Sequence, residues 1–145
     1  MLTANERIKA IRERRGMTQK QLASAASLSP AEICAIEKRM RSPQTDTIQE
    51  IAAALDVSVS LLLGEFYSDL PLGKALTRDS FNIFVQREKL TDEQERILRG
   101  IINTDSAPQT VKGWRELIQN LGAFENLKGQ SAESRIFDHA PQRNE

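Results

Sequence analysis

Two short amphipathic segments separated by a polar break constrain the fold of this chain more than any other feature. They lie in TQKQLASAASLSPAEICAIE, residues 18–37. Leu22 and Ala26 are the apolar positions of the first segment, and Ile33 and Ile36 are those of the second. Both pairs have helical spacing, so each segment predicts a short helix with one buried face. Helices this short bury such faces best by crossing each other.

The ends of the two segments carry explicit helix-start signals. Thr18 with Gln21 three residues later has the pattern of a capping box, and Ser29 followed by Pro30 has the pattern of a helix start. Ala23 lies where a larger side chain would push the two helices apart. Two short helices that meet at a steep angle form a helix-turn-helix, and that is the motif predicted here.

Apolar periodicity predicts helices along most of the chain and no competing strand in the first half. The fold class we expect is all-α: a five-helix lambda-repressor-like DNA-binding domain over residues 1–65 and a small helical C-terminal domain over residues 76–124. Residues 66–75, with Pro71 and Gly73, read as a linker, and residues 125–145 are polar, lack periodicity and are expected to be disordered. Four expected helices span about residues 5–15, 78–88, 92–102 and 108–121. Between the first and second of these, one helix is capped by Thr18 and one by Ser29, a third begins at Thr45 or Asp46, and a short fourth begins at Ser58 or Ser60 and ends at Gly64.

The charge distribution points to phosphate contact at the N-terminal end. The whole chain has a net charge of zero. Residues 1–45 carry nine Lys and Arg against four Glu, which gives +5, whereas residues 46–65 carry four acids and no base, which gives −4. A local basic surface on a neutral protein suits nucleic-acid binding without strong non-specific attraction. Ordinary solvated helix faces are the alternative.

Composition excludes several classes of function. Cys34 and His139 are the only cysteine and histidine, so no disulfide, multi-cysteine metal site or nucleophile–base pair is expected, and no cofactor is indicated. We expect no enzymatic activity. No apolar run approaches the ~18–20 residues of a membrane span, and the charged N-terminus does not resemble a signal peptide, so a cytoplasmic protein without membrane association is expected.

The outer face of the second short helix is the candidate DNA-reading surface. Each helical residue advances by about 100°, so Ala31, Cys34, Ala35 and Lys38 lie opposite the two buried isoleucines. The major groove admits one α-helix, and small side chains let it lie deep. The alternative for the two alanines is that they are merely exposed helix formers, and for Cys34 that it is an inert thiol rather than a redox sensor.

The stretches TQKQLASAASLSPAEICAIEKRMRSP and TIQEIAAALDVSVSLLLGE resemble the Cro/lambda-repressor (Xre) class of helix-turn-helix domains over the first 65 residues. The resemblance implies binding to double-stranded DNA as a homodimer on a near-palindromic site. It implies that Gln19 contacts phosphate and that Pro30, Ala31 and Ala35 occupy base-reading positions, with Glu32 and Cys34 adjacent. Alanine offers only a methyl contact to thymine, so DNA shape should contribute to specificity. The full set of expected DNA-binding residues is Gln19, Lys20, Ser29, Pro30, Ala31, Glu32, Cys34, Ala35, Lys38, Arg39 and Arg41.

Two positions depart from the pattern of that class. Ser27 stands where glycine is usual in the turn, and Arg39 stands where glycine commonly follows the third helix. We expect a strained turn at Ser27. At Arg39 the alternatives are a longer helix and an added phosphate contact.

The second half is expected to hold the dimer together. Phe81, Phe84 and Trp114 are the aromatic anchors of this prediction, with Leu117 beside them on the last helix. The alternative, compatible with dimerisation, is that the aromatic side chains only fill the core of the C-terminal domain.

The second half also resembles the C-terminal part of DdrO/ImmR-type repressors of stress or mobile-element genes, over about residues 76–124. That resemblance implies inactivation by a partner metalloprotease of the ImmA/IrrE type, with a binding antirepressor as the alternative. The implied cleavage segment is Leu98, Arg99, Gly100, Ile101, Ile102, Asn103 and Thr104. Gly100 would weaken the helix there by roughly 1 kcal/mol relative to alanine, unless it serves close packing instead.

An antitoxin is the alternative class of function. The chain could be an antitoxin that binds a toxin with its second half and represses its own operon with the first. The folded character predicted for the second half favours a repressor.

Overall fold

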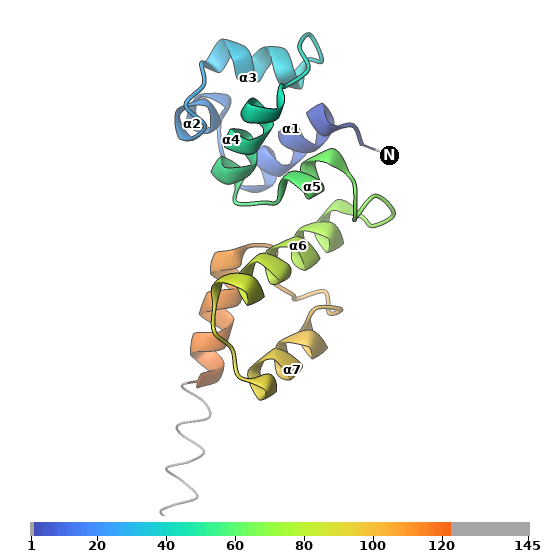
Figure 1. Cartoon of the computed structure of the whole chain (residues 1–145), viewed down its shortest axis with the longest axis vertical. Coiled ribbons are helices and arrows are strands. Elements are labelled where there is room, and N and C mark those ends of the chain that lie inside the picture. The colour runs from blue at the N-terminus through green and yellow to red at the C-terminus, as the bar shows by residue number, and fades with distance from the viewer. Residues whose placement is uncertain (1, 123–145) are drawn as a thin grey trace, which may run out of the picture.

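The computed structural model describes residues 2–122, which form eight helices and no strand (Figure 1). The expected all-α fold is therefore confirmed for this part of the chain. The tail predicted to be disordered, residues 125–145, lies outside the described residues. The helices are α1 (Ala4–Arg14), α2 (Gln19–Ala25), α3 (Pro30–Glu37), α4 (Thr45–Leu55), α5 (Val59–Leu63), α6 (Leu72–Arg87), α7 (Asp92–Ile101) and a final helix over residues 111–122.

Local capping chemistry determines where several helices begin. The predicted capping box at Thr18 with Gln21 is confirmed, and Thr91 with Gln94 forms another at the start of α7, with each threonine oxygen accepting from the backbone N–H three residues later. Thr3 forms a further capping box with Glu6 at the start of α1.

Two helix starts differ from the predictions. The final helix begins at residue 111 rather than 108, because the Thr110 hydroxyl oxygen caps it by accepting from the Gly113 amide at 2.9 Å. α6 begins at Leu72 rather than 78, inside the segment expected to be a linker. Pro71 is its N-cap residue, and Leu72 packs against the first core, so Pro71 and Gly73 mark a helix start rather than a long loop.

Two hydrophobic cores lie one after the other along the molecule, and α6 contributes to both. The first core collects buried aliphatic residues of α1–α5 together with Ala75 and Leu76 from the start of α6. The second is built around Phe81, Phe84 and Trp114. In Figure 1, α6 accordingly runs from the underside of the α1–α5 group into the group formed with α7 and the final helix.

Polar contacts join the two parts at the same junction. Asp79 of α6 is buried and accepts from the Ser58 amide at 2.9 Å and the Ser58 hydroxyl at 2.5 Å, immediately before α5. Arg15 donates to the Gln109 carbonyl at 3.0 Å, and Arg14 donates to the Gln109 side chain at 3.1 Å. Burial lowers the pKa of Arg15. These contacts link α1 and α5 to the second half of the chain.

Candidate DNA-binding face

α2 and α3 pack as one rigid pair, as a helix-turn-helix requires. Leu22, Ala23, Ile33 and Ile36 expose at most 1 % of their surface. Ala23 thus lies in the closely packed region between the helices, where the sequence analysis placed it. The pair leaves the opposite face of α3 directed away from the core, at the upper end of the molecule in Figure 1.

The turn between the two helices contains a residue in the left-handed conformation. Ser27 has φ 58°, and the next amide, Leu28 N, donates to the Ala23 carbonyl at 2.8 Å to close the end of α2. Non-glycine residues reach this region at a cost of roughly 1–2 kcal/mol because of the Cβ atom. The expected strain at Ser27 is therefore present in the backbone.

The outer face of α3 consists of small side chains with a few polar groups. Ser29, Pro30 and Ala31 are exposed at its N-terminal end, and Glu32, Cys34 and Ala35 are partly exposed along it. The Ser29 oxygen accepts from the Glu32 amide at 3.1 Å, which leaves the hydroxyl proton able to donate outward. Such a helix can approach base edges closely because nothing long projects from its centre.

The side chain of Gln19, which was predicted to contact phosphate, already forms a hydrogen bond within the protein. Its Nε2 donates to Glu37 at 2.8 Å, and the same carboxylate accepts from Arg12 Nε at 2.6 Å and Nη2 at 3.2 Å. The Glu37 side chain is 2 % exposed, and its hydrogen bond raises the pKa of Arg12. One carboxylate thus links α1, α2 and the end of α3, and Gln19 keeps one amide proton for another acceptor.

Sequence reasoning missed Arg12 and Glu37 as a functional pair. They are 25 residues apart, and no motif joins them in the sequence. Their role is to fix the angle at which α3 stands against α1 and α2. Because the pair is almost fully buried, neither group is available for direct contact with DNA.

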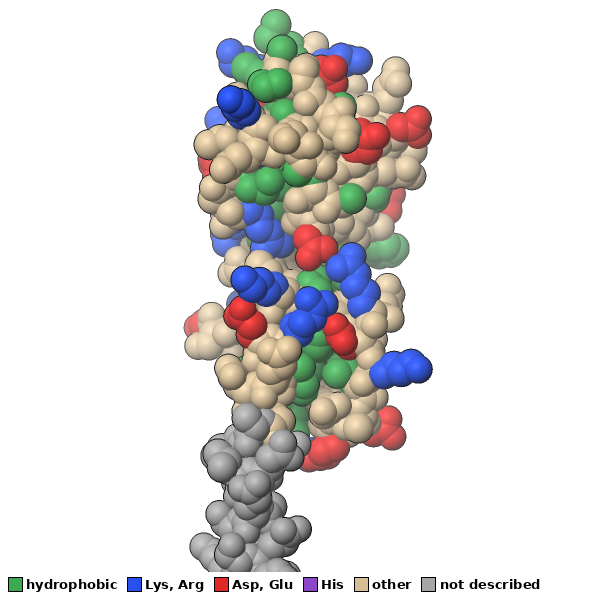
Figure 2. All heavy atoms as spheres, turned by 90° about the vertical axis from the view of Figure 1, so that its left-hand side faces the viewer, with side chains coloured by type: hydrophobic (Ala, Val, Ile, Leu, Met, Phe, Trp, Pro, Cys, Tyr) green, Lys and Arg blue, Asp and Glu red, His purple; other side chains and the backbone are tan. Residues whose placement is uncertain are grey.

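The cationic side chains after α3 differ in whether they form an ion pair. Arg39 has φ 59° and forms an ion pair with Glu6, and α3 ends at Glu37, so the alternative of a longer helix is wrong. Lys20, Lys38 and Arg41 are exposed and form no ion pair within residues 2–122. In Figure 2, Lys and Arg side chains appear around the upper end of the molecule, where α3 lies.

The aromatic residues predicted as dimer anchors are internal to the single chain. Phe81, Phe84 and Trp114 expose at most 1 % of their surface, and Trp114 donates from Nε1 to the Ser80 hydroxyl at 2.9 Å. The Phe81 and Trp114 rings meet edge to face with centroids 5.1 Å apart. Their role as direct interface contacts therefore does not fit this fold, whereas core filling does.

Leu117 is only partly buried and remains available to a partner. It lies on the final helix with Ile118 and Leu121, which are also half-buried and pack at the edge of the second core. Figure 2 shows hydrophobic side chains reaching the surface in the lower half of the molecule.

The implied cleavage segment straddles the end of α7. Leu98 is fully buried, Ile101 and Ile102 are half-buried, and the remaining members, Arg99, Gly100, Asn103 and Thr104, are exposed. A Cβ added at Gly100 would meet no atom within 4 Å. The alternative that Gly100 serves close packing is therefore wrong.

No helix within residues 2–122 is long and apolar enough to cross a bilayer, and the same residues hold no cluster of three or more metal-ligating side chains.

Comparison with known proteins shows what the helix-turn-helix segment and the chain are similar to. Residues 8–62 match the family model described as helix-turn-helix. The immunity repressor protein of Bacillus phage phi105 is 42 % identical over 64 residues, which span 44 % of this chain and 44 % of that protein. The HTH-type transcriptional regulator DdrOP3 of Deinococcus deserti is 28 % identical over 121 residues, which span 80 % of this chain and 93 % of that protein. Both resemblances expected from the sequence are thus confirmed.

Among solved structures, the SinR protein/SinI protein complex is similar at 22 % identity and a TM-score of 0.43, covering 86 % of this chain and 99 % of that one.

Proposed function

Because residues 8–62 match the helix-turn-helix family model, we propose that this protein is a sequence-specific transcriptional repressor of the Xre type. It acts in the cytoplasm and binds a near-palindromic operator in double-stranded DNA as a homodimer. The observation that carries the proposal is the outer face of α3, whose side chains are mostly small and are exposed or partly exposed. Lys38 and Arg41, which form no ion pair within residues 2–122, lie beside this face. That combination suits a helix lying in the major groove between phosphate contacts.

Specificity on this face depends on few hydrogen bonds. In this proposal Glu32 accepts from a cytosine amino group, and Ser29 and Lys38 donate to base or phosphate oxygens. Ala31 and Ala35 can contribute methyl contacts to thymine. The remaining discrimination comes from DNA shape at positions that no side chain reads.

Ala35→Glu tests whether this face enters the groove. A carboxylate there should reduce operator binding at least a hundredfold, because it would oppose the phosphates and block close approach. The matched control is Ala53→Glu, which adds the same charge at an exposed position of α4. Selection of bound sequences from random DNA supplies the operator, and fluorescence anisotropy measures affinity. Equal affinities of the two variants, with normal helicity, would contradict the proposal.

A second pair of substitutions separates base contacts from phosphate contacts. Glu32→Ala should relax preference at one base pair, by roughly 1–3 kcal/mol. Arg41→Ala should instead weaken binding to specific and random DNA alike, and should lower the salt dependence. The assignment of Glu32 to a base contact fails if Glu32→Ala weakens binding to specific DNA and to random DNA equally.

Dimerisation is proposed through the partly exposed apolar surface of the final helix. Leu117, Ile118 and Leu121 support this surface, because their half-buried side chains would lose further contact with water in an interface. Leu117→Glu should give monomers in analytical ultracentrifugation at micromolar concentration, whereas Gln119→Glu, at an exposed position of the same helix, should leave the dimer intact. A full-length chain that is monomeric at this concentration would remove the dimer proposal.

Proteolytic inactivation is the proposed switch, supported by the 28 % sequence identity to DdrOP3 over 80 % of this chain. Cleavage within residues 98–104 would separate the final helix from the DNA-binding helices. An ImmA/IrrE-type metalloprotease from the same genome should cut there, with loss of operator binding, and mass spectrometry maps the fragments. Gly100→Ala should slow cleavage, because alanine strengthens the end of α7 by roughly 1 kcal/mol and adds no clash. An intact chain, with the protease active on another substrate, would favour a binding antirepressor.

A further inference from the structure

The loop between α7 and the final helix is fastened to the first part of the chain by three cationic side chains. Arg15, the C-cap residue of α1, donates from Nη1 to the Gln109 carbonyl at 3.0 Å, and Arg14 donates to the Gln109 side chain at 3.1 Å. Lys74 donates to the Asp105 carboxylate at 3.1 Å. The loop is therefore held at two points along its length.

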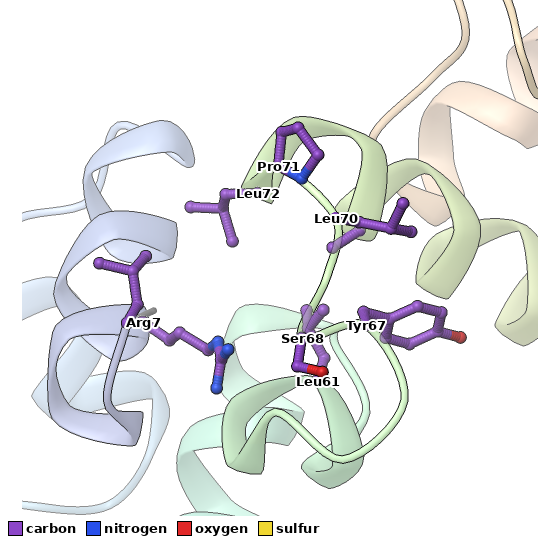
Figure 3. Close-up of a pocket in the computed structure, with 9 residues that line it drawn as sticks. Arg7, Leu61, Tyr67, Ser68, Leu70, Pro71 and Leu72 are labelled. Atoms are coloured by element: carbon purple, nitrogen blue, oxygen red, sulfur yellow. The ribbon is translucent and has the colours of Figure 1, made fainter.

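Lys74 belongs to the first turn of α6, and this turn is itself packed against the DNA-binding half. Leu72 of the same turn packs against the first core. Figure 3 shows the Leu72 side chain directed toward α1, beside a pocket of about 260 Å³ that it lines together with Arg7 and Leu61. The cations that fasten the loop therefore stand on one packed unit, and the loop can leave that unit only if their contacts break.

Arg15 is held at this junction without being fully satisfied by it. Its Nε donates to the Leu55 carbonyl at 3.3 Å and its Nη1 to Gln109, but its Nη2 is buried and has no acceptor in the part of the chain that the structure describes. Burial lowers the pKa of Arg15, and the charges of Asp56 and Asp79 raise it, yet neither carboxylate pairs with Nη2. A buried donor without an acceptor costs free energy that is regained when water reaches it.

The segment proposed for cleavage, residues 98–104, is folded and joined directly to this fastened loop. Leu98 is fully buried in the last turns of α7. The Thr104 amide closes the turn after the helix by donating to the Ile101 carbonyl at 2.9 Å. Proteolysis of a folded segment acts on its transiently opened state. The end of α7 must therefore unwind before it can be cut, and a loop fastened immediately after it leaves little slack for that.

We propose that the contacts of Arg14, Arg15 and Lys74 with this loop form a latch that keeps residues 98–104 closed to proteases. The latch opens locally when the loop leaves α1 and α6 and water reaches the unmet donor of Arg15. Opening breaks two exposed hydrogen bonds and one partly buried one, while the core of the helix-turn-helix stays folded. The inference rests on the proposed proteolytic switch for its biological role, but the latch itself can be measured without the partner protease.

Hydrogen exchange followed by mass spectrometry tests the latch in the full-length chain. Arg15→Met keeps the apolar stem and removes the donors, so the amides of residues 98–104 should exchange roughly tenfold faster while those of α3 keep their rates. Arg78→Met is the matched control, since it removes an exposed arginine of α6 and should leave exchange in the segment unchanged. Equal exchange of the segment in the two variants would overturn the proposal.

Lys74→Met provides a second variant in case Arg15→Met loosens the whole chain and speeds exchange in α3 as well. It removes only an exposed contact of the latch, so exchange within residues 98–104 should become roughly twofold faster and the rates of α3 should stay the same. An unchanged rate in the segment of Lys74→Met would refute the latch.

Limited proteolysis separates the latch from the proposed switch. Thermolysin cleaves before isoleucine and should cut Arg15→Met at Ile101 or Ile102 roughly tenfold faster than the unchanged chain, with the fragments mapped by mass spectrometry. Faster cutting by thermolysin, with the chain left intact by an ImmA/IrrE-type protease, would support the latch and remove the switch. Cutting by the ImmA/IrrE-type protease at equal rates in Arg15→Met and the unchanged chain would support the switch and overturn the latch.

Discussion

Replacing Asp79 by alanine should destabilise the folded chain by about 2–4 kcal/mol, because this buried carboxylate holds α6 against the start of α5. Asp79 is 2 % exposed and accepts from Ser58 through two hydrogen bonds, at 2.9 Å and 2.5 Å. A hydrogen bond to a charged group contributes about 1.5–3 kcal/mol, and alanine removes both. The net loss should lie below the sum of the two, since the substitution also removes the desolvation cost of a buried carboxylate.

Urea denaturation followed by circular dichroism measures this loss. With a slope of about 1–3 kcal/mol per molar urea, the midpoint should fall by roughly 1–2 M. Asp69→Ala is the control, because it removes an exposed carboxylate and should leave the midpoint nearly unchanged. Asp79→Asn retains one acceptor oxygen, so its urea midpoint should lie between those of Asp79→Ala and Asp69→Ala.

A double-mutant cycle with Ser58→Ala identifies the source of the effect. Ser58→Ala removes the hydroxyl bond to Asp79 and keeps the bond from the Ser58 amide. If the hydroxyl bond carries part of the stabilisation, the losses of the single variants should not add, with a coupling of about 1 kcal/mol or more, and additive losses would remove the hydroxyl bond from the account. An Asp79→Ala midpoint equal to that of Asp69→Ala would refute the reasoning that this contact joins the two parts of the chain.

Three other substitutions test the DNA-binding half and the second core. Ser27→Gly should stabilise the chain by up to about 1 kcal/mol in urea denaturation, because glycine relieves the left-handed strain, partly offset by the greater freedom of the unfolded chain. Glu37→Gln should cost about 2 kcal/mol or more and weaken operator binding without touching DNA, since it leaves Arg12 buried beside a neutral partner; unchanged stability would contradict this. Trp114→Phe should cost roughly 1–3 kcal/mol through the lost indole N–H bond to Ser80 and the lost ring volume, although the Ser80 hydroxyl still donates to the Thr77 carbonyl; a calorimetric scan showing no shift would contradict it.

Much of the first half could be predicted from the sequence because its signals are local. Thr18 with Gln21 and Ser29 with Pro30 determine helix starts through contacts with amides three residues away, and these positions were confirmed. The buried faces of α2 and α3 also follow from helical periodicity. The exposed outer face of α3 is the complement of that pattern, so its location could be predicted too.

The tertiary structure decided what depends on residues far apart in the sequence. The extension of α6 to Leu72 depends on packing against the first core, which can offset a proline and a glycine that locally favour a loop. Phe81 and Trp114 are internal because another helix covers them, whereas a single helix pattern cannot distinguish a core aromatic from an interface aromatic. The Arg12–Glu37 pair joins positions 25 residues apart, which no local pattern specifies. The sequence thus determined the helices and the reading face through short-range geometry, and only the fold, by bringing distant side chains into contact, decided how that face is held and where α6 begins.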